Sequence, residues 1–252
     1  MNTQDDDAPG APCWVETWQP DPRAAARFYG ALLGWRFDEP TIVAETGGGY
    51  LTARLDGRRV AGIGQGPPGA PAVWSTSIRV ARLESEVTRV QAAGGSHLAG
   101  PLSVGDDGRL AVVADPAGVA FGLWEPRGRI GAELTGRPST WAMSALHTPD
   151  PERAAAFYGD LFGWELAPDD GAPFSRWELG GRLVAVLAGT DGAAVPAHWA
   201  VNLAVGDVDA VTARATSLAG VVLMAPFDTP GLRNAVIADP QGAVLALSGP
   251  VS

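Results

Sequence analysis

PDPRAAARFYGALLGW, residues 20–35, returns as PDPERAAAFYGDLFGW at residues 149–164. Eleven of the sixteen positions are identical, and the two copies lie 129 residues apart. Each copy predicts a helix, because an aspartate stands at the N-cap, a proline follows in the first turn, and a glycine ends the phrase. A strand-like stretch precedes each copy, CWVETWQ at 13–19 and AMSALHT at 142–148. The chain therefore repeats a unit of strand and helix.

A second kind of unit follows each copy of this phrase. VWSTSIRV (73–80) and HWAVNLAV (198–205) each lead into a predicted helix and then into hairpins that carry ADPAG or ADPQG. We interpret these DPxG segments as hairpin turns and not as phosphate-binding loops. Glycine-broken apolar runs supply about three further strands in every unit. The chain is therefore predicted to be α+β, with four βαβββ modules at roughly 12–66, 70–127, 139–190 and 195–250.

The modules predict two domains. One βαβββ module cannot bury both sides of its sheet, so two modules side by side should curve into an incomplete β-barrel with a cup inside. Cup one would belong to domain one and cup two to domain two. The predicted layout is a disordered acidic N-terminus, a first domain, a linker and a second domain, at residues 1–11, 12–127, 128–138 and 139–250.

Composition and charge exclude several classes of function. The net charge is −10, and all eighteen basic residues are arginine, which excludes a lysine Schiff base and argues against nucleic-acid binding. No apolar run approaches the roughly 20 residues of a membrane span, and the N-terminus does not resemble a signal peptide. Cys13 is the single cysteine, so neither an intrachain disulfide nor a cysteine-rich zinc site is possible. We expect a cytoplasmic monomer or homodimer.

The pattern of a strand, D-P-x-x-A-x-x-F-Y-x-x-x-x-G-W, and a later DPxG hairpin resembles the vicinal oxygen chelate superfamily. This superfamily includes glyoxalase I, the bleomycin-resistance proteins and the extradiol dioxygenases. The resemblance covers essentially the whole chain after residue 12, and the tandem arrangement is similar to that of two-domain actinobacterial proteins, some from antibiotic gene clusters. It implies the predicted fold and, in the family's enzymes, one divalent metal held in the cup by histidine and glutamate.

The family's metal-ligand positions fall here on residues that do not bind metal. By register these positions are Trp14, Ser75, Met143 and Ala200 on the leading strands, Gly122 and Ala246 in the final hairpins, and positions near Ile63 and Val186. None of them carries an imidazole or a carboxylate. A slip of one residue would not rescue the site, since side chains alternate faces along a strand. We therefore expect neither a metal nor another cofactor.

Strand alternation assigns a different set of side chains to cup one. These are Trp14, Glu16, Trp18, Ser75, Ser77 and Arg79, with Gly122 leaving room beside them. Tryptophans with a few polar groups are typical of a site for a flat, mostly apolar ligand. A carboxylate between two tryptophans should have a raised pKa, which suits Glu16 as a general acid or base. In the alternative interpretation Glu16 pairs with Arg79 or is wetted at the rim.

Cup two should carry Met143, Ala145, His147, His198, Ala200 and Asn202, with Ala246 leaving room. His147 is its candidate base, because the ordinary pKa of histidine lies near about 6.5. In the alternative interpretation it is a surface residue at a strand end.

The predicted function is metal-independent binding of a hydrophobic or aromatic small molecule of the secondary-metabolite type in a Trp-lined cup. A catalytic version is an isomerase, lyase or hydroxylase-like tailoring enzyme, in which Glu16 or His147 moves a proton. Ser77, Arg79 or Asn202 would then hydrogen-bond the developing oxyanion. One alternative is a metal-dependent lyase or dioxygenase with displaced ligands, for example Glu16, His147 and His198. A second alternative is a non-catalytic regulatory or drug-sequestering protein.

Overall fold

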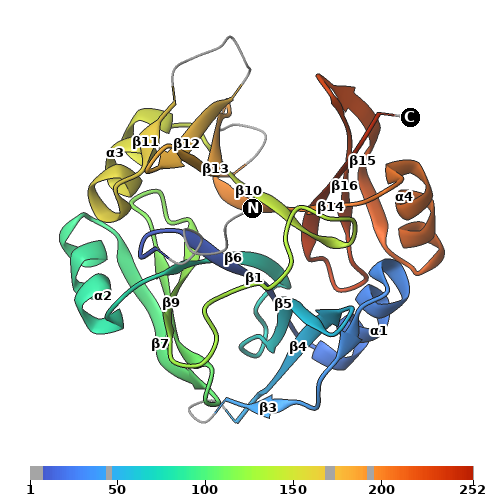
Figure 1. Ribbon diagram of the computed structural model, residues 1–252, viewed down its shortest axis with the longest axis horizontal. Helices are drawn as coiled ribbons and strands as arrows, with labels where there is room; N and C mark the ends of the chain where they lie inside the picture. The colour runs from blue at the N-terminus through green and yellow to red at the C-terminus, as the bar shows by residue number, and fades with distance from the viewer. Residues whose placement is uncertain (1–7, 44–46, 168–173, 192–195, 252) are drawn as a thin grey trace.

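The computed structural model describes residues 8–43, 47–167, 174–191 and 196–251, and it forms four consecutive strand–helix–strand modules (Figure 1). Module one comprises β1 (Pro12–Gln19), α1 (Pro22–Leu33), β2 (Arg36–Phe37), β3 (Thr41–Ile42), β4 (Gly49–Leu55) and β5 (Arg58–Gln65). Module two comprises β6 (Val73–Arg79), α2 (Leu83–Ala92), β7 (Ser96–Val104), β8 (Gly108–Ala114) and β9 (Ala120–Pro126).

The second half of the chain repeats this order. Module three comprises β10 (Thr140–Thr148), α3 (Pro151–Phe162), β11 (Glu165–Leu166), β12 (Ser175–Leu179) and β13 (Arg182–Gly189). Module four comprises β14 (His198–Ala204), α4 (Val208–Ser217), β15 (Val221–Thr229), β16 (Leu232–Ala238) and β17 (Val244–Gly249). The predicted fold class is confirmed, and module one differs only by the additional two-residue strand β3. None of the helices in the described residues is long and apolar enough to cross a membrane.

The repeated phrase forms α1 and α3 through its capping residues. The carboxylate of Asp21 accepts hydrogen bonds from two backbone N–H groups of the first turn of α1, and Asp150 accepts one in α3. Both helices end at a glycine with a positive φ, 77° at Gly34 and 74° at Gly163, a conformation that an L side chain rarely adopts.

Consecutive modules pair into one sheet each. Sheet A has the strand order β2-β4-β5-β1-β6-β9-β8-β7, and sheet B has the order β11-β12-β13-β10-β14-β17-β16-β15. In each sheet the two leading strands pair antiparallel at the centre, and each has a parallel neighbour on its other side. The inner face of sheet A is cup one, and the inner face of sheet B is cup two.

The other face of each sheet packs in cores that both halves of the chain share. One core combines α1, β4 and β5 with β14, β16, β17 and α4, and the other combines α2, β8 and β9 with α3, β12 and β13. Figure 1 shows the result, with α1 beside α4 on one side and α2 beside α3 on the other. The hydroxyls of Thr76 and Ser144 lie 2.6 Å apart where the two sheets meet. The cups therefore face away from each other.

Buried hydrogen bonds join the two repeated motifs across the halves. Tyr29 in α1 donates its hydroxyl proton to Asp239 of the ADPQG turn at 2.8 Å, and it accepts from Trp74 Nε1 at 2.9 Å. The backbone of that turn donates to the same carboxylate, as expected of a hairpin turn. The other half holds the equivalent set, Trp199, Tyr158 and Asp115. The repeated helix phrase and the DPxG turn are thus parts of one hydrogen-bonded unit.

The end of the N-terminal segment is held to the folded chain, and the register of β5 differs from the expected one by one residue. Of the segment 1–11 that was expected to be disordered, residues 1–7 lie outside the described part of the chain. Gly10, however, donates to the carbonyl of Arg79 and accepts from Trp164 Nε1 at 2.7 Å.

Ile63 lies in the core behind sheet A, and its neighbour Gly62 pairs with Glu16 on the inner face. The ligand position assigned near Ile63 therefore belongs to Gly62.

Candidate functional site

Cup one brings together the residues that strand alternation assigns to it. Trp14 pairs with Ser77 and Glu16 with Ser75 across β1 and β6, so these four side chains share the inner face. Arg79 pairs with Trp124 on the same face, and Trp18 packs beside them. Cup one is closed, however, since only 1% of Trp14 and 2% of Glu16 is exposed to solvent.

Two side chains of cup one donate to Glu16, and a third supports one of them. Tyr50 donates its hydroxyl proton to Oε2 at 2.6 Å, Ser77 donates to Oε1 at 3.2 Å, and Trp14 Nε1 donates to the Tyr50 hydroxyl at 2.7 Å. Burial raises the pKa of Glu16, as predicted, while Tyr50, the positive charge of Arg129 and Ser77 limit the rise. Tyr50 was not among the predicted site residues, although alternation along β4 places it on this face.

Arg129, a residue of the segment 128–138 predicted as a linker, fills the middle of cup one. Its guanidinium carbon lies 3.9 Å from the ring centroid of Trp14 and 4.3 Å from that of Trp124, and only 1% of Arg129 is exposed. Its Nε lies 3.3 Å from Asp107, and Trp124 Nε1 donates to its carbonyl at 2.8 Å. The linker therefore covers the cup in which we expected a ligand.

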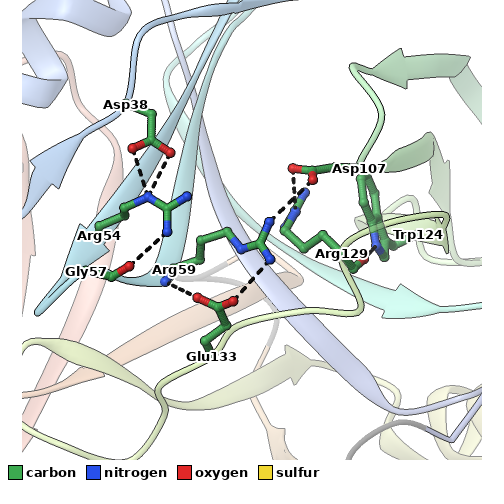
Figure 2. A network of polar contacts seen from close by, with 8 residues as sticks. All are labelled: Asp38, Arg54, Gly57, Arg59, Asp107, Trp124, Arg129 and Glu133. Carbon is green, nitrogen blue, oxygen red and sulfur yellow. Dashed lines mark hydrogen bonds and ion pairs between the residues drawn. The ribbon is translucent and has the colours of Figure 1, made fainter.

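Ion pairs fasten this linker to sheet A (Figure 2). Arg59 contacts Asp107 at 3.4 Å and Glu133 at 3.1 Å, and Glu133 also accepts from the Arg59 backbone N–H at 2.7 Å. The backbone N–H groups of residues 127, 128 and 129 all donate to the carbonyl of Asp107. Because charged and backbone groups both hold it, the linker is an integral part of cup one.

The residues of cup one do not fit the metal site of the superfamily. A side chain at Gly62 would clash with the Tyr50 hydroxyl, and one at Gly122 would clash with Ser77 Oγ. A glutamate ligand therefore has no room at either position. The prediction that Gly122 leaves space for a ligand is wrong for the same reason, because Ser77 and Leu110 occupy that space.

Cup two has the same register but small side chains. Ala145 pairs with Ala200 on one side and with Val186 on the other, while Asn202 pairs with Met143 and with Ala246. All six of these residues are half-buried. The same face continues over β16 and β15, where Val236 pairs with Met224 and Asn234 with Phe227. Cup two is therefore an apolar inner face that remains partly open to solvent.

A row of polar side chains crosses this face. Asn202 donates from Nδ2 to Ser248 Oγ at 2.7 Å, and Ser248 donates to Asn234 Oδ1 at 2.6 Å. Asn234 in turn donates to Thr229 Oγ1 at 2.8 Å. These bonds leave Asn202 Oδ1 without a hydrogen-bond partner among the described residues. Asn202 was a predicted site residue, whereas Ser248 and Asn234, which lie on later strands, were not.

His147 and His198 form a pair at the end of cup two. Their ring centroids are 4.8 Å apart and their planes differ by 8°, so the rings are stacked. Burial lowers the pKa of His147, and the neighbouring His198 lowers it further. Glu16 lies on the other sheet, so the displaced ligand set of Glu16, His147 and His198 does not converge. The described residues contain no group of three side chains that could hold a metal ion.

Comparison with known proteins agrees with this architecture. The model of the glyoxalase-like domain matches twice, at residues 14–124 and 143–248. The chain belongs to the glyoxalase-like domain family. Among its glyoxalase-like relatives, the anthracycline biosynthesis protein DnrV of Streptomyces peucetius is 38% identical over 258 residues, covering 94% of this chain and 92% of DnrV. CFP32 of Mycobacterium tuberculosis is 35% identical over 254 residues, covering 96% of this chain and 95% of CFP32.

Solved structures of the vicinal oxygen chelate superfamily share the fold. The Mn(II)-bound glyoxalase from Novosphingobium aromaticivorans superposes with a TM-score of 0.64 at 14% identity, covering 96% of this chain and 83% of that chain. The 2,3-dioxygenase LapB from Pseudomonas sp. KL28 also gives a TM-score of 0.64, at 12% identity, covering 96% of this chain and 92% of that chain. The likeness extends over both halves of this glyoxalase-like chain.

Proposed function

We propose that this glyoxalase-like protein binds a flat, mostly apolar small molecule in cup two, without a metal. The observation that carries the proposal is the contrast between the two inner faces. In cup one the central side chains are buried by the linker, whereas in cup two the equivalent positions are alanine, valine and methionine and are partly exposed. An apolar inner face with a few polar groups is the usual form of a small-molecule site.

The polar groups of cup two suit a ligand that carries hydroxyl or carbonyl oxygens. Asn202, Ser248 and Asn234 bring hydrogen-bonded amide and hydroxyl groups to this otherwise apolar face, and a few polar groups of this kind orient a bound ligand. His147 is the base of this face in our proposal, because its lowered pKa keeps the imidazole neutral near pH 7. The ligand would be a phenol or a related aromatic compound, in agreement with relatives named for anthracycline biosynthesis.

A dye-binding titration tests the site. The probe is 1-anilinonaphthalene-8-sulfonate, a flat apolar anion whose emission rises in apolar surroundings. Ala246→Trp should weaken binding by about tenfold, since a large ring at the centre of cup two takes the ligand's place and removes about 1.4 kcal/mol or more of binding. Ile42→Trp is the matched control, because Ile42 is 61% exposed on β3 of sheet A, and it should bind the dye as the wild type does.

A second pair of variants separates the two cups. Ala200→Trp should repeat the effect of Ala246→Trp, and Glu16→Gln should leave dye binding unchanged. Dye affinity that both tryptophan substitutions in cup two leave intact would overturn the proposal. Native mass spectrometry of the purified wild type is an independent test, since it would identify the chemical class of any ligand that co-purifies, and the same substitutions should abolish its retention.

A further inference from the structure

Arg129 occupies a cage with two aromatic walls. The guanidinium lies between the rings of Trp14 and Trp124, at 3.9 Å and 4.3 Å from their centroids. Tryptophan is the strongest of the aromatic partners for a cation, and such contacts strengthen when water is excluded. Only 1% of each of these three side chains is exposed, so water is excluded here.

Negative charge surrounds the cage. Asp107 approaches Arg129 Nε at 3.3 Å, and Glu16 lies on the same inner face with both of its carboxylate oxygens hydrogen-bonded. The charge of Arg129 is felt by its neighbours, because it lowers the pKa values of Glu16, Tyr50 and Cys13 against the effect of burial. The cage is thus arranged for a cation and not only for an apolar plug.

Hydrogen bonds contribute little to holding the guanidinium. Nη1 and Nη2 of Arg129 are both buried, and neither has a hydrogen-bond partner among the described residues. The guanidinium is therefore held by the rings of Trp14 and Trp124 against its two faces, by the attraction of its charge, and by one long hydrogen bond from Nε to Asp107. A site of this kind recognises a planar cation whether or not that cation belongs to an arginine of the chain.

We propose that cup one is a binding site for planar cations of the guanidinium class, which the chain fills with its own Arg129. A free guanidine-type ligand competes with the linker for this cage. Such a ligand would displace the Arg129 side chain from the cage, while the backbone hydrogen bonds to Asp107 and the ion pair between Arg59 and Glu133 still hold the linker to sheet A. The proposal is independent of ligand binding in cup two.

Chemical rescue tests the proposal. Arg129→Ala should lower the melting temperature by several degrees, because it removes the cation that acts on Glu16 and one of the two cations that contact Asp107. Guanidinium chloride at tens of millimolar, far below denaturing concentrations, should restore at least half of that loss. Urea at the same concentration is the neutral planar control and should restore none of it. Arg54→Ala, which removes an ion pair to Asp38 outside the cage, should show no rescue by guanidinium.

A second substitution covers the case in which the alanine variant does not fold. Arg129→Gln keeps a planar group in the cage but removes its charge, and it should melt several degrees below the wild type. A Gln variant as stable as the wild type would overturn the proposal, because a cation would then be unnecessary. Equal rescue of Arg129→Ala by urea and by guanidinium would also overturn it, and so would the absence of any rescue in a folded Arg129→Ala protein.

Discussion

Glu16 and Arg129 place a carboxyl group and a guanidinium in an interior that excludes water. A buried charge is costly unless other groups compensate it, and here Tyr50, Ser77 and Asp107 supply the hydrogen bonds and the countercharge. The sequence predicted a raised pKa for Glu16. In the alternative interpretation, Glu16 was expected to pair with Arg79. In the structure Tyr50 and Ser77 donate to Glu16, and the positive charge that limits the rise of its pKa comes from Arg129, in a segment that has no regular secondary structure.

The stacked histidines lead to a prediction about the pKa of His147. Burial is the larger cause of the lowered pKa of His147 and His198 the smaller one, so His198→Gln should raise that pKa only part of the way to its ordinary value. NMR titration of the histidine ring protons would measure it, with His97, which lies outside the cups, as an internal reference. A His147 pKa that returns fully to its ordinary value in His198→Gln would contradict this order of causes.

The same shift has a consequence for stability. The folded pKa of His147 lies below its unfolded value, so the unfolded chain binds the proton more tightly. Its contribution to stability is therefore present above the unfolded pKa of about 6.5 and is lost as the pH falls through the folded pKa. Replacing His147 with glutamine should flatten this part of the profile of unfolding free energy against pH.

At the scale of elements, glycines in β5 and β9 allow large side chains to cross the inner face of sheet A. Tyr50 lies over Gly62, Trp18 over Gly64, and Ser77 beside Gly122. The equivalent positions in sheet B carry valine and alanine, and no large ring of the described residues crosses them in the same way. This difference, spread over a few strand positions, makes one cup closed and leaves the other open.

Gly122 tests this account of strand packing. Gly122→Ala should lower the free energy of unfolding by about 1–3 kcal/mol, because the new methyl group would overlap Ser77 Oγ. Adding Ser77→Ala should recover part of that loss, which a double-mutant cycle by urea unfolding would measure. Gly206→Ala is the control, since no atom lies within 4 Å of a methyl group added there. Additive effects of the two substitutions would show that the contact does not carry the cost.

At the scale of the whole molecule, the two halves share their cores. The α1 helix of the first half packs with α4 of the second, and the Tyr29 hydroxyl donates to Asp239 across 210 residues of sequence. The strands of modules one and two form one sheet, and those of modules three and four form the other. In the cores, by contrast, module one packs against module four and module two against module three. Each half alone would expose one side of both cores.

Separation of the halves should therefore abolish independent folding. We expect residues 1–133, expressed alone, to lack a cooperative thermal transition as a monomer, because the apolar surface behind sheet A would face water. Co-expression with residues 134–252 should give a 1:1 complex that melts cooperatively. Circular dichroism and size-exclusion chromatography measure both outcomes, and a folded monomer of residues 1–133 would refute the shared-core account.

The sequence by itself determined the local structure and the fold class of this protein. The capped helix phrase, the DPxG turns and the alternation of β1 and β10 all depend on neighbouring residues, whose spacing the sequence displays directly. For the same reason Trp14, Glu16 and Ser77 could be assigned to one inner face, and Met143 and Asn202 to the other. Strand register also identifies the family's metal-ligand positions in the sequence, where no residue carries an imidazole or a carboxylate.

Only the tertiary structure decided which cup is open. Arg129 enters cup one from a linker with no periodic pattern, and its position depends on contacts with Trp14 and Asp107, which lie far from it in the sequence. Tyr29 and Asp239 likewise meet only because modules one and four pack together. Contacts between distant segments are set by the burial of whole faces, a property of the assembled sheets that no short stretch of sequence contains.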